Sequence, residues 1–463
     1  MAESSMTERN TRATFDVMSL TLLVVASMIG VGVFTTSGYT LAAVGSPARV
    51  ILCWILGGVI ALCGATAYGR LASLMPQSGG EYLYLSRTVH PLAGFLAGWI
   101  SLTAGFSGAI ATAAVAFEQY AMPDTVRPVG IPKDTLAVAV VILFGLMHGL
   151  RPGCGQFTQN AVVAVKVAAL TAFLAVAVFK IGVHDWNFSA TENSPATIRR
   201  SLTAIANSLV WISLSYAGFN AAIYVAGESR EAARIVPKAL LLGTAGVSVL
   251  YVLLNLAFVT ATPTSAIVGQ GPVAAIAAKA IGGPNLERLI RFTVSLGLLS
   301  SISGMIMTGP RVYSQMASDG VFPTVFSMEQ RGPGLSIGLQ TAIAAVLIVI
   351  QHLLVSTGLL ESSLLGLFIY LGTTLSVSSA CCAATVFLPG VRKQLDSCSP
   401  AGDIACFIYV AATLVSVIVM AVSHQVDGKS QGIWHLSGAV LTLITGGIAW
   451  RVFRSHIAGY NRS

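Results

Sequence analysis

Most of this 463-residue chain consists of apolar runs, each about long enough to cross a lipid bilayer. A transmembrane helix needs about 20 mostly apolar residues, and lipid offers no partner for free backbone N–H and C=O groups, so such spans must be helical. The predicted spans are 15–43, 47–74, 91–120, 135–150, 156–182, 203–227, 237–261, 287–317, 335–355, 361–388, 403–423 and 433–453. The sequence therefore predicts an all-α polytopic membrane protein with about twelve transmembrane helices.

The composition excludes most soluble classes. Only 10% of the residues are charged, against about 25% in an ordinary soluble domain, and 55% are apolar. The net charge of +8 comes from Lys and Arg residues that stand singly between apolar runs, so no basic stripe forms and nucleic-acid binding is not expected. The excess fits loops that face anionic lipid, which makes the bilayer the expected partner.

An even number of spans places both termini on the same side of the membrane. The first fourteen residues are polar, and the apolar run after them is too long for a cleaved signal peptide. With the termini in the cytoplasm, about fifteen Lys and Arg residues fall inside and about ten outside. This bias predicts a multi-pass protein of the cell (inner) membrane with both termini cytoplasmic.

Two spans are interrupted at corresponding places. The first carries Ile29-Gly30-Val31-Gly32-Val33 at mid-span, and the sixth carries Tyr216-Ala217-Gly218-Phe219-Asn220. Glycine costs up to about 1 kcal/mol in a helix, and unwound backbone at this depth is tolerated only where it lines a cavity. Close helix packing is the alternative explanation for such glycines. Matched interruptions in two halves indicate a transporter binding site.

The spacing of the two interruptions predicts two inverted repeats of five helices each, followed by two additional helices. The expected parts are an N-terminal tail 1–14, a transport core 15–388 with repeats 15–182 and 203–388, two added helices within 401–455, and a tail 456–463.

Four segments carry a family resemblance. They are Ile29 to Phe34; Tyr68 to Trp99, with Leu74-Met75-Pro76-Gln77-Ser78-Gly79-Gly80-Glu81-Tyr82 and Pro91 to Phe95; Tyr216 to Asn220 with Gly227-Glu228 and Val236 to Leu240; and Gly309 to Tyr313 with Met316 to Gly320 and Pro323. In these segments the chain resembles the amino acid–polyamine–organocation superfamily, in particular its bacterial amino acid permeases. The resemblance implies the LeuT-type fold and substrates that are amino acids or close relatives.

An amino acid brings a carboxylate and an ammonium group, and burying either without partners is costly. We expect the N–H groups of Val31, Gly32 and Val33, at the start of a half-helix, to bind the carboxylate. Carbonyls near Met28 and Ile29, with those of 214–217, would receive the ammonium group. The predicted substrate-binding residues are Ile29, Gly30, Val31, Gly32, Val33, Leu214, Ser215, Tyr216, Ala217, Gly218, Phe219 and Asn220.

The side-chain pocket has several candidates, each of which has packing as its alternative role. They are Ser101, Thr103 and Ser107 in the third span and Trp211, Tyr216 and Phe219 in the sixth. The resemblance implies a gating aromatic at position 214, which is Leu214 here, so the gate is weaker or is formed by another ring such as Trp211 or Phe219.

Acidic residues are almost absent from the spans. Glu118, near the end of the third span, is the nearest exception, and a position at the membrane interface explains it. A cationic substrate side chain needs a buried acid as its partner, so a neutral amino acid is favoured over a cationic amino acid or a polyamine.

Lys166 lies in the middle of the fifth span, too far from either end to reach water. An ionisable group at this depth is a functional hypothesis by default. Three interpretations remain open: Lys166 carries the coupling proton, it stays charged and holds the unwound first span in place of sodium, or it faces a water-filled vestibule. Proton-coupled symport is the first hypothesis for the transport mode, and sodium-independent exchange against a second amino acid is the alternative.

Other classes find no support in the sequence. The spans contain no HExxH, GxSxG or paired Asp, so an enzyme is not expected, and no Cys or His spacing predicts a metal or another cofactor. The seven cysteines are interpreted as small buried apolar residues. The long central loop of a major facilitator is missing, and no feature suggests a channel. The sequence leaves the oligomeric state open.

The remaining ionisable residues are expected near the membrane surface. His148, at the inner end of the fourth span, is predicted to be interfacial, and Arg230, Glu231 and Arg234 are predicted to lie in a solvated loop after the sixth.

Overall fold

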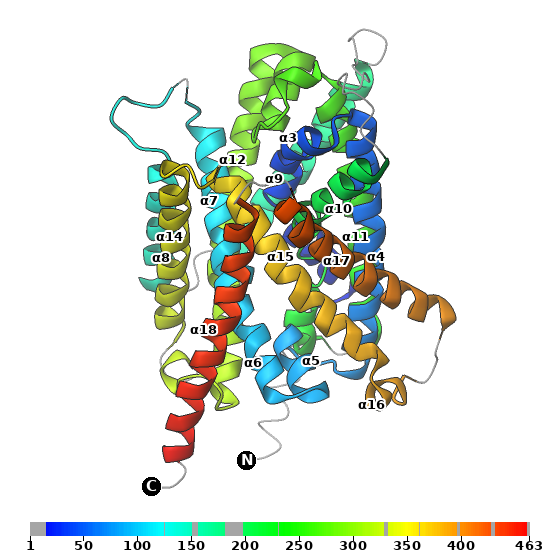
Figure 1. The fold of residues 1–463 in the computed structure, drawn as a ribbon, viewed down its shortest axis with the longest axis vertical. Coiled ribbons are helices and arrows are strands. Elements are labelled where there is room, and N and C mark those ends of the chain that lie inside the picture. The colour runs from blue at the N-terminus through cyan, green and yellow to red at the C-terminus, as the bar shows by residue number, and fades with distance from the viewer. Residues whose placement is uncertain are drawn as a thin grey trace.

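The computed structural model describes residues 15–124, 126–150, 156–180, 198–229, 231–327, 332–360, 362–395, 399–426 and 431–460. Every regular element within these ranges is a helix, as the apolar spans predict (Figure 1). The first half contains α2 (Val17–Met28), α3 (Gly32–Val44), α4 (Pro47–Leu74), α5 (Gly80–Thr88), α6 (Pro91–Ile100), the π-helix η1 (Ser101–Gly108), α7 (Ala109–Ala121), α8 (Thr135–Leu150) and α9 (Gln156–Phe179). The second contains α10 (Ile198–Ser215), the 3-10 helix η2 (Ala221–Glu228), α11 (Ala232–Thr260), η3 (Thr264–Ala266), α12 (Val273–Ser318), η4 (Thr324–Phe326), α14 (Gly334–Ser356), α15 (Ser363–Ala384), η5 (Thr385–Phe387), α16 (Pro389–Arg392), α17 (Pro400–Val426) and α18 (Gln431–Tyr460).

The helices account for the twelve expected spans. Within the described ranges, seven helical segments are long and apolar enough to cross a membrane, and α2 and α3 form an eighth span that is bent by 44°. Four shorter apolar helices, in α8, α9, α10 and α18, occupy the remaining predicted spans. The second and fourth spans begin and end where the sequence places them.

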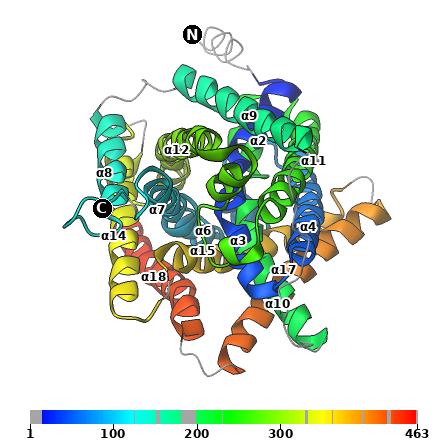
Figure 2. The same cartoon turned by 90° about the horizontal axis from the view of Figure 1, so that it is seen from above.

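Two groups of helices pack side by side (Figure 2). The first consists of α2, α3, α4, α10 and α11, and the second of α7, α8, α12 and α14. The helix α9 contacts α11 of the first group and α12 of the second. The end of the molecule that carries α5, α16 and the last turns of α18 is called here the terminal end (Figure 1). The loop between α7 and α8 lies at the opposite end.

The connection after the seventh span contains a helix that the hydropathy pattern does not reveal. The helix α12 is broken at Gly282 and Gly283, so that residues 273–281 form a separate, largely buried helix. The loop before it is held against α3, because the N–H of Gly269 donates to the carbonyl of Gly38. The segment therefore covers the opposite end of the first span.

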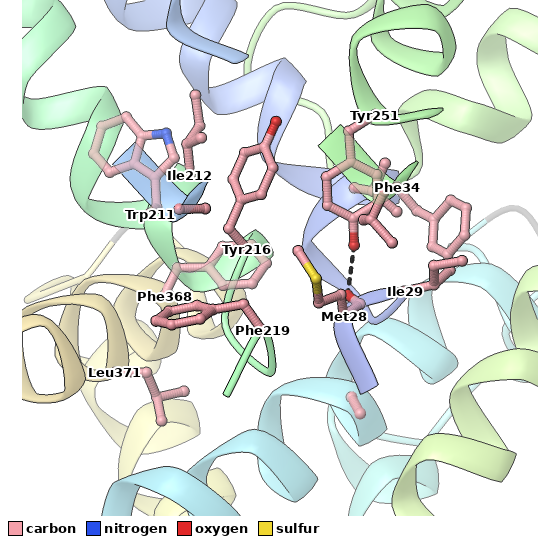
Figure 3. Close-up of a cluster of buried hydrophobic side chains, with 14 of the residues drawn as sticks. Met28, Ile29, Phe34, Trp211, Ile212, Tyr216, Phe219, Tyr251, Phe368 and Leu371 are labelled. Atoms are coloured by element: carbon pink, nitrogen blue, oxygen red, sulfur yellow. Dashed lines mark hydrogen bonds between the residues drawn. The ribbon is translucent and has the colours of Figure 1, made fainter. Parts of the chain in front are cut away.

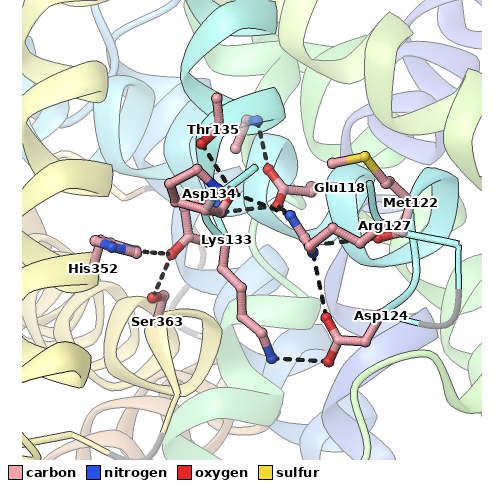
Figure 4. Close-up of polar contacts among 11 residues, drawn as sticks. Glu118, Met122, Asp124, Arg127, Lys133, Asp134, Thr135, His352 and Ser363 are labelled. Carbon is pink, nitrogen blue, oxygen red and sulfur yellow. Dashed lines mark hydrogen bonds and ion pairs between the residues drawn. The ribbon is translucent and has the colours of Figure 1, made fainter. Parts of the chain in front are cut away.

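Glu118 is buried at the opposite end, although the sequence suggested an interfacial residue that reaches water. Its carboxylate lies 2.7 Å from the Arg127 guanidinium and accepts hydrogen bonds from the N–H groups of Asp134 (2.8 Å) and Ala137 (2.9 Å) (Figure 4). Carboxylates stabilise helix N-termini by binding free N–H groups. Glu118 thus closes the first turn of α8 and fixes it against α7.

A second group of contacts joins the same loop to α14 and α15. The Asp134 carboxylate lies 3.1 Å from Nδ1 of His352 and accepts a hydrogen bond from Ser363 (3.0 Å) (Figure 4). Farther out, the exposed Lys133 donates to Asp124, and this hydrogen bond holds the pKa of Asp124 below its usual range.

His148, at the end of α8, is buried, with Nε2 lying 2.8 Å from the Ser303 hydroxyl. The interpretation of all seven cysteines as buried residues is wrong, because Cys381 is exposed and Cys63 is only partly buried. Cys154 and Cys398 lie outside the described residues.

We expect Glu118→Gln to lower the free energy of unfolding by about 3 kcal/mol, because it removes the buried counter-ion of the Arg127 guanidinium, which is only 13% exposed, and leaves it only the exposed Asp124 at 3.4 Å. Chemical unfolding of purified protein in detergent measures this. The control is Lys133→Gln, which breaks a pair that is 66% and 67% exposed and is expected to cost less than about 1 kcal/mol. Equal effects of the two changes would contradict the assignment.

Candidate substrate site at the two broken helices

The first span is interrupted where the sequence predicts. The helix α2 ends at Met28 and α3 begins at Gly32, with three non-helical residues between them. The N–H of Gly30 turns back onto the carbonyl of Met28 at 2.7 Å. Because the first N–H groups of a helix have no intrahelical partner, those of Gly32 and Val33 remain available to a ligand.

The sixth span is interrupted at the same depth. The helix α10 ends at Ser215, residues 216–220 form turns, and η2 begins at Ala221. Gly218 adopts a φ of +95°, a conformation that side-chain-bearing residues rarely adopt. A Cβ atom at this position would lie 2.8 Å from the carbonyl oxygen of Ser27, so the second break rests directly on the end of α2.

Gly32 makes a second close contact between the two spans. A Cβ atom there would lie 2.1 Å from Oγ of Ser215 and 2.7 Å from its Cα. At Gly30, by contrast, the nearest atom would be 3.7 Å away. The sequence pattern does not distinguish Gly30 from Gly32. In the structure, only Gly32 lies where the crossing of the two spans leaves no room for a side chain.

The carbonyls expected to receive the substrate ammonium already have donors. Tyr251 of α11 donates its hydroxyl hydrogen to the carbonyl of Met28 at 2.5 Å (Figure 3), and Lys166 of α9 donates to the carbonyl of Ile29 at 2.5 Å. A carbonyl oxygen accepts two hydrogen bonds. The carbonyl of Met28 also accepts the N–H of Gly30, so both of its positions are taken, whereas the carbonyl of Ile29 retains one position for a ligand. Tyr251 was not identified from the sequence, because an aromatic residue in an apolar span carries no signal of what its hydroxyl contacts.

Lys166 is 3% exposed, so a role in a water-filled vestibule does not fit. Its stem passes over Gly297 of α12, where a Cβ atom would lie 2.7 Å from Cδ of the lysine. The ammonium group meets the carboxyl end of α2, where the helix dipole is negative. The structure therefore places the Lys166 ammonium group on the first break.

Aromatic rings surround the two breaks (Figure 3). The Tyr216 ring packs with Trp54 and Tyr251 at centroid distances of 5.7 and 5.2 Å, and its hydroxyl donates to the carbonyl of Trp54. The side chain of Tyr216 thus anchors the break to α4 and α11. Leu214, at the position of the expected gate, is only partly buried.

The two alternative gating rings lie in different surroundings. Trp211 donates its indole N–H to the Thr40 hydroxyl of α3 at 2.9 Å. Phe219 packs edge-on against Tyr68 at 5.4 Å and Tyr409 at 6.0 Å. Trp211 therefore contacts the half-helix α3, and Phe219 lies on the side of η2.

The polar candidates of the third span lie in a π-helix, a structure that is often found at functional sites. Thr103 donates to the carbonyl of Trp99, and Ser101 is buried. The Ser107 hydroxyl is buried and has no partner among the residues that the structure describes. Ser107 therefore has a polar atom left for a ligand.

Charged residues after the sixth span are exposed as expected. Arg234 lies 3.7 Å from Glu231, with both side chains more than half exposed, while Arg230 is outside the described residues. Two surface hollows of about 530 and 380 Å³ lie near the terminal end of the molecule. Neither hollow is lined by residues of the two breaks.

Two interrupted helices that cross at mid-span and leave half-helix N–H groups free define a transport protein of the LeuT type. The model of the "Amino acid permease" family matches residues 15–453. The chain therefore belongs to the amino acid permease family.

Individual relatives are more distant. The chain is 26% identical to mouse "Solute carrier family 7 member 12" over 79% of its own length and 76% of that protein's. It is 25% identical to the rabbit "Large neutral amino acids transporter small subunit 2", with 66% of this chain covered and 58% of that protein. It is 23% identical to the "Serine/threonine exchanger SteT" of Bacillus subtilis, with coverage of 71% and 75%.

A solved structure shares the fold. A mutant of the Eremococcus coleocola manganese transporter superposes with a TM-score of 0.58 at 14% identity, covering 94% of this chain and 96% of that one. At this identity the likeness concerns the fold alone. The relatives are transporters, and the chain is likewise a transporter of amino acids rather than an enzyme.

We expect Gly32→Ala to abolish amino acid uptake and to destabilise the protein by about 1–3 kcal/mol, because the new methyl group collides with the backbone of Ser215. Uptake into liposomes and thermal unfolding measure the two effects. Adding Ser215→Gly removes two of the three nearest atoms and should restore part of the stability.

The control is Gly338→Ala in α14, where no atom lies within 4 Å of the new Cβ. This change is expected to leave uptake intact and to be neutral or slightly stabilising. Normal uptake by the Gly32→Ala protein would show that the two spans do not cross this tightly.

Proposed function

We propose that this protein exchanges neutral amino acids across the membrane without sodium, and that the ammonium group of Lys166 takes the place of a bound cation. The observation that carries the proposal is the contact between Lys166 Nζ and the carbonyl of Ile29 in the first break. A cation at this position stabilises a backbone that the surrounding helix no longer satisfies.

The substrate is proposed to bind through the main chain. Its carboxylate would accept hydrogen bonds from Val31, Gly32 and Val33, at the positive end of α3. Its ammonium group would contact the carbonyl of Ile29 in the first break and those of 214–217 in the second, since the Met28 carbonyl is occupied by Gly30 and Tyr251. Of the predicted set, the side chains of Ser215 and Asn220 contact other protein groups, and these residues contribute through the break that they hold in place.

A neutral side chain is proposed because the acids nearest to the site are occupied. The Glu118 carboxylate is paired with Arg127, and the Glu81 carboxylate accepts three hydrogen bonds from neutral donors. A cationic substrate would have to replace one of these partners. The name of the bacterial relative, a serine/threonine exchanger, agrees with a small neutral substrate and with exchange.

Proton-coupled symport is the second candidate. It is supported by one observation: in the described part of the chain, no carboxylate lies within ion-pair distance of Lys166. A buried ammonium without a counter-ion is easier to deprotonate than a paired one. If Lys166 releases its proton during the cycle, its charged hydrogen bond to the carbonyl of Ile29 would be lost, and the first break would be free to move.

We further propose that the terminal end faces the cytoplasm at the cell (inner) membrane, on the basis of the excess of Lys and Arg in the loops of that side.

The function is tested with purified protein in liposomes and all twenty radiolabelled amino acids. Exchange predicts uptake of neutral amino acids that requires amino acid inside the vesicle, persists when sodium is replaced, and ignores a proton gradient. Uptake that responds to the proton gradient without internal substrate supports symport instead. A requirement for sodium contradicts both.

Lys166→Met is expected to lower uptake by about tenfold or more, since a hydrogen bond from a charged group is worth about 1.5–3 kcal/mol. The matched control is Lys238→Met, which makes the same change at an exposed lysine of α11. Equal uptake by the two variants would remove Lys166 from the mechanism.

A further inference from the structure

Glu81 is a buried carboxylate that the transport mechanism above does not use. It lies in the first turn of α5 at the terminal end and is 7% exposed. In the described part of the chain no Lys, Arg or His lies within ion-pair distance of it. A buried charge needs partners, and here they are neutral.

Three donors from three different elements surround this carboxylate. Asn220, the last residue of the second break, donates to Oε1 at 2.6 Å, and Tyr68 of α4 donates to the same oxygen at 3.1 Å. Tyr224 of η2 donates to Oε2 at 2.5 Å. Hydrogen bonds to an ionised acceptor are about twice as strong as neutral ones. Glu81 therefore ties η2 and the second break to α4 and α5.

The helix α5 is anchored elsewhere. Tyr82, the next residue, donates to Asp319 at the end of α12 at 2.6 Å, and its ring belongs to an apolar cluster with Phe95 of α6. Glu81 and Tyr82, which are adjacent on the short helix α5, thus contact different parts of the protein. Tyr82 fixes α5 to the second group of helices, while Glu81 holds a part of the sixth span.

The segment that Glu81 holds is suited to move. Residues 219–228, which follow the glycine that rests on α2, form turns and a 3-10 helix and not an α-helix. Opening the terminal end would require η2 to leave α5, and this breaks the hydrogen bonds from Asn220 and Tyr224. An exposed ion pair between Glu228 of η2 and Arg311 of α12, at 3.9 Å, also joins these elements and is weak by comparison.

We propose that Glu81 is the latch of the terminal-end gate: its carboxylate keeps that end closed by binding Asn220 and Tyr224, and their release is part of opening. Glu81 acts as a positioning residue, since it contacts the break and not the substrate. The role of this gate in transport rests on the proposed function. The hydrogen bonds of Glu81 do not depend on which amino acid is transported.

Cys382 of α15 is a natural reporter for this gate. It is fully buried and lies beside Tyr68 and Glu81, so a thiol reagent reaches it from the terminal end only after the latch has opened. The neighbouring exposed Cys381 is replaced by Ala. A membrane-impermeant maleimide is then added to each face of vesicles in turn, and labelling of Cys382 is followed by mass spectrometry without any substrate.

Glu81→Gln and Tyr224→Phe are each expected to speed labelling of Cys382 about tenfold, and only from the face that carries the terminal end. Combining the two changes should add little, because both break the same contact. Should Glu81→Gln not fold, Tyr224→Phe and Tyr68→Phe test the same carboxylate.

Two matched controls isolate the latch. Tyr84→Phe makes the same change on α5 at a buried hydroxyl that has no hydrogen-bond partner among the described residues. Glu231→Gln makes the same change at an acid exposed at the same end. Both should label like the parent.

Parent-like labelling of folded Glu81→Gln and Tyr224→Phe overturns the proposal, as does equal labelling of Tyr84→Phe and Tyr224→Phe. Because labelling needs no substrate, failure of the latch is distinguishable from failure of the proposed function. Even if the protein transports no neutral amino acid, the rate of Cys382 labelling would still show whether the gate opens.

Discussion

The structure depends on one constraint: a peptide group inside a membrane needs a hydrogen-bond partner that lipid does not offer. Unbroken helices meet this demand within themselves, and most of this chain is built that way. The two breaks do not, and they are where partners must come from other elements. Lys166 and Tyr251 supply donors to the carbonyls of the first break, and the N–H groups at the start of α3 are left for a ligand.

The same demand explains why the breaks lie in contact. The backbone of one span rests on the other at Gly32 and Gly218, where a side chain would leave no room. Aromatic residues of α4 and α11 close the remaining space, with the Tyr216 hydroxyl bound to a carbonyl of α4. The site is therefore a junction of four spans and not a property of either broken helix alone.

Much of this arrangement could be predicted from the sequence, since it is encoded locally. Glycines at mid-span predicted both breaks to within a residue or two, and a lysine in an apolar run predicted a functional group at that depth. What could not be predicted depends on contacts between distant segments. The difference between Gly30 and Gly32 comes from Ser215, and the burial of His148 comes from α12. Glu81 stood inside a recognised motif, but nothing nearby in the sequence shows that it reaches Asn220.

The tethering of Lys166 has a consequence for the energy that such a protein can use. A sodium ion enters from one side and leaves on the other, and its descent along a gradient performs work. A cation that is covalently part of the chain returns unchanged at the end of each cycle if it keeps its proton. It stabilises the site as an ion would but contributes nothing to accumulation. The only driving forces left to such a protein are the concentrations of the amino acids on its two sides.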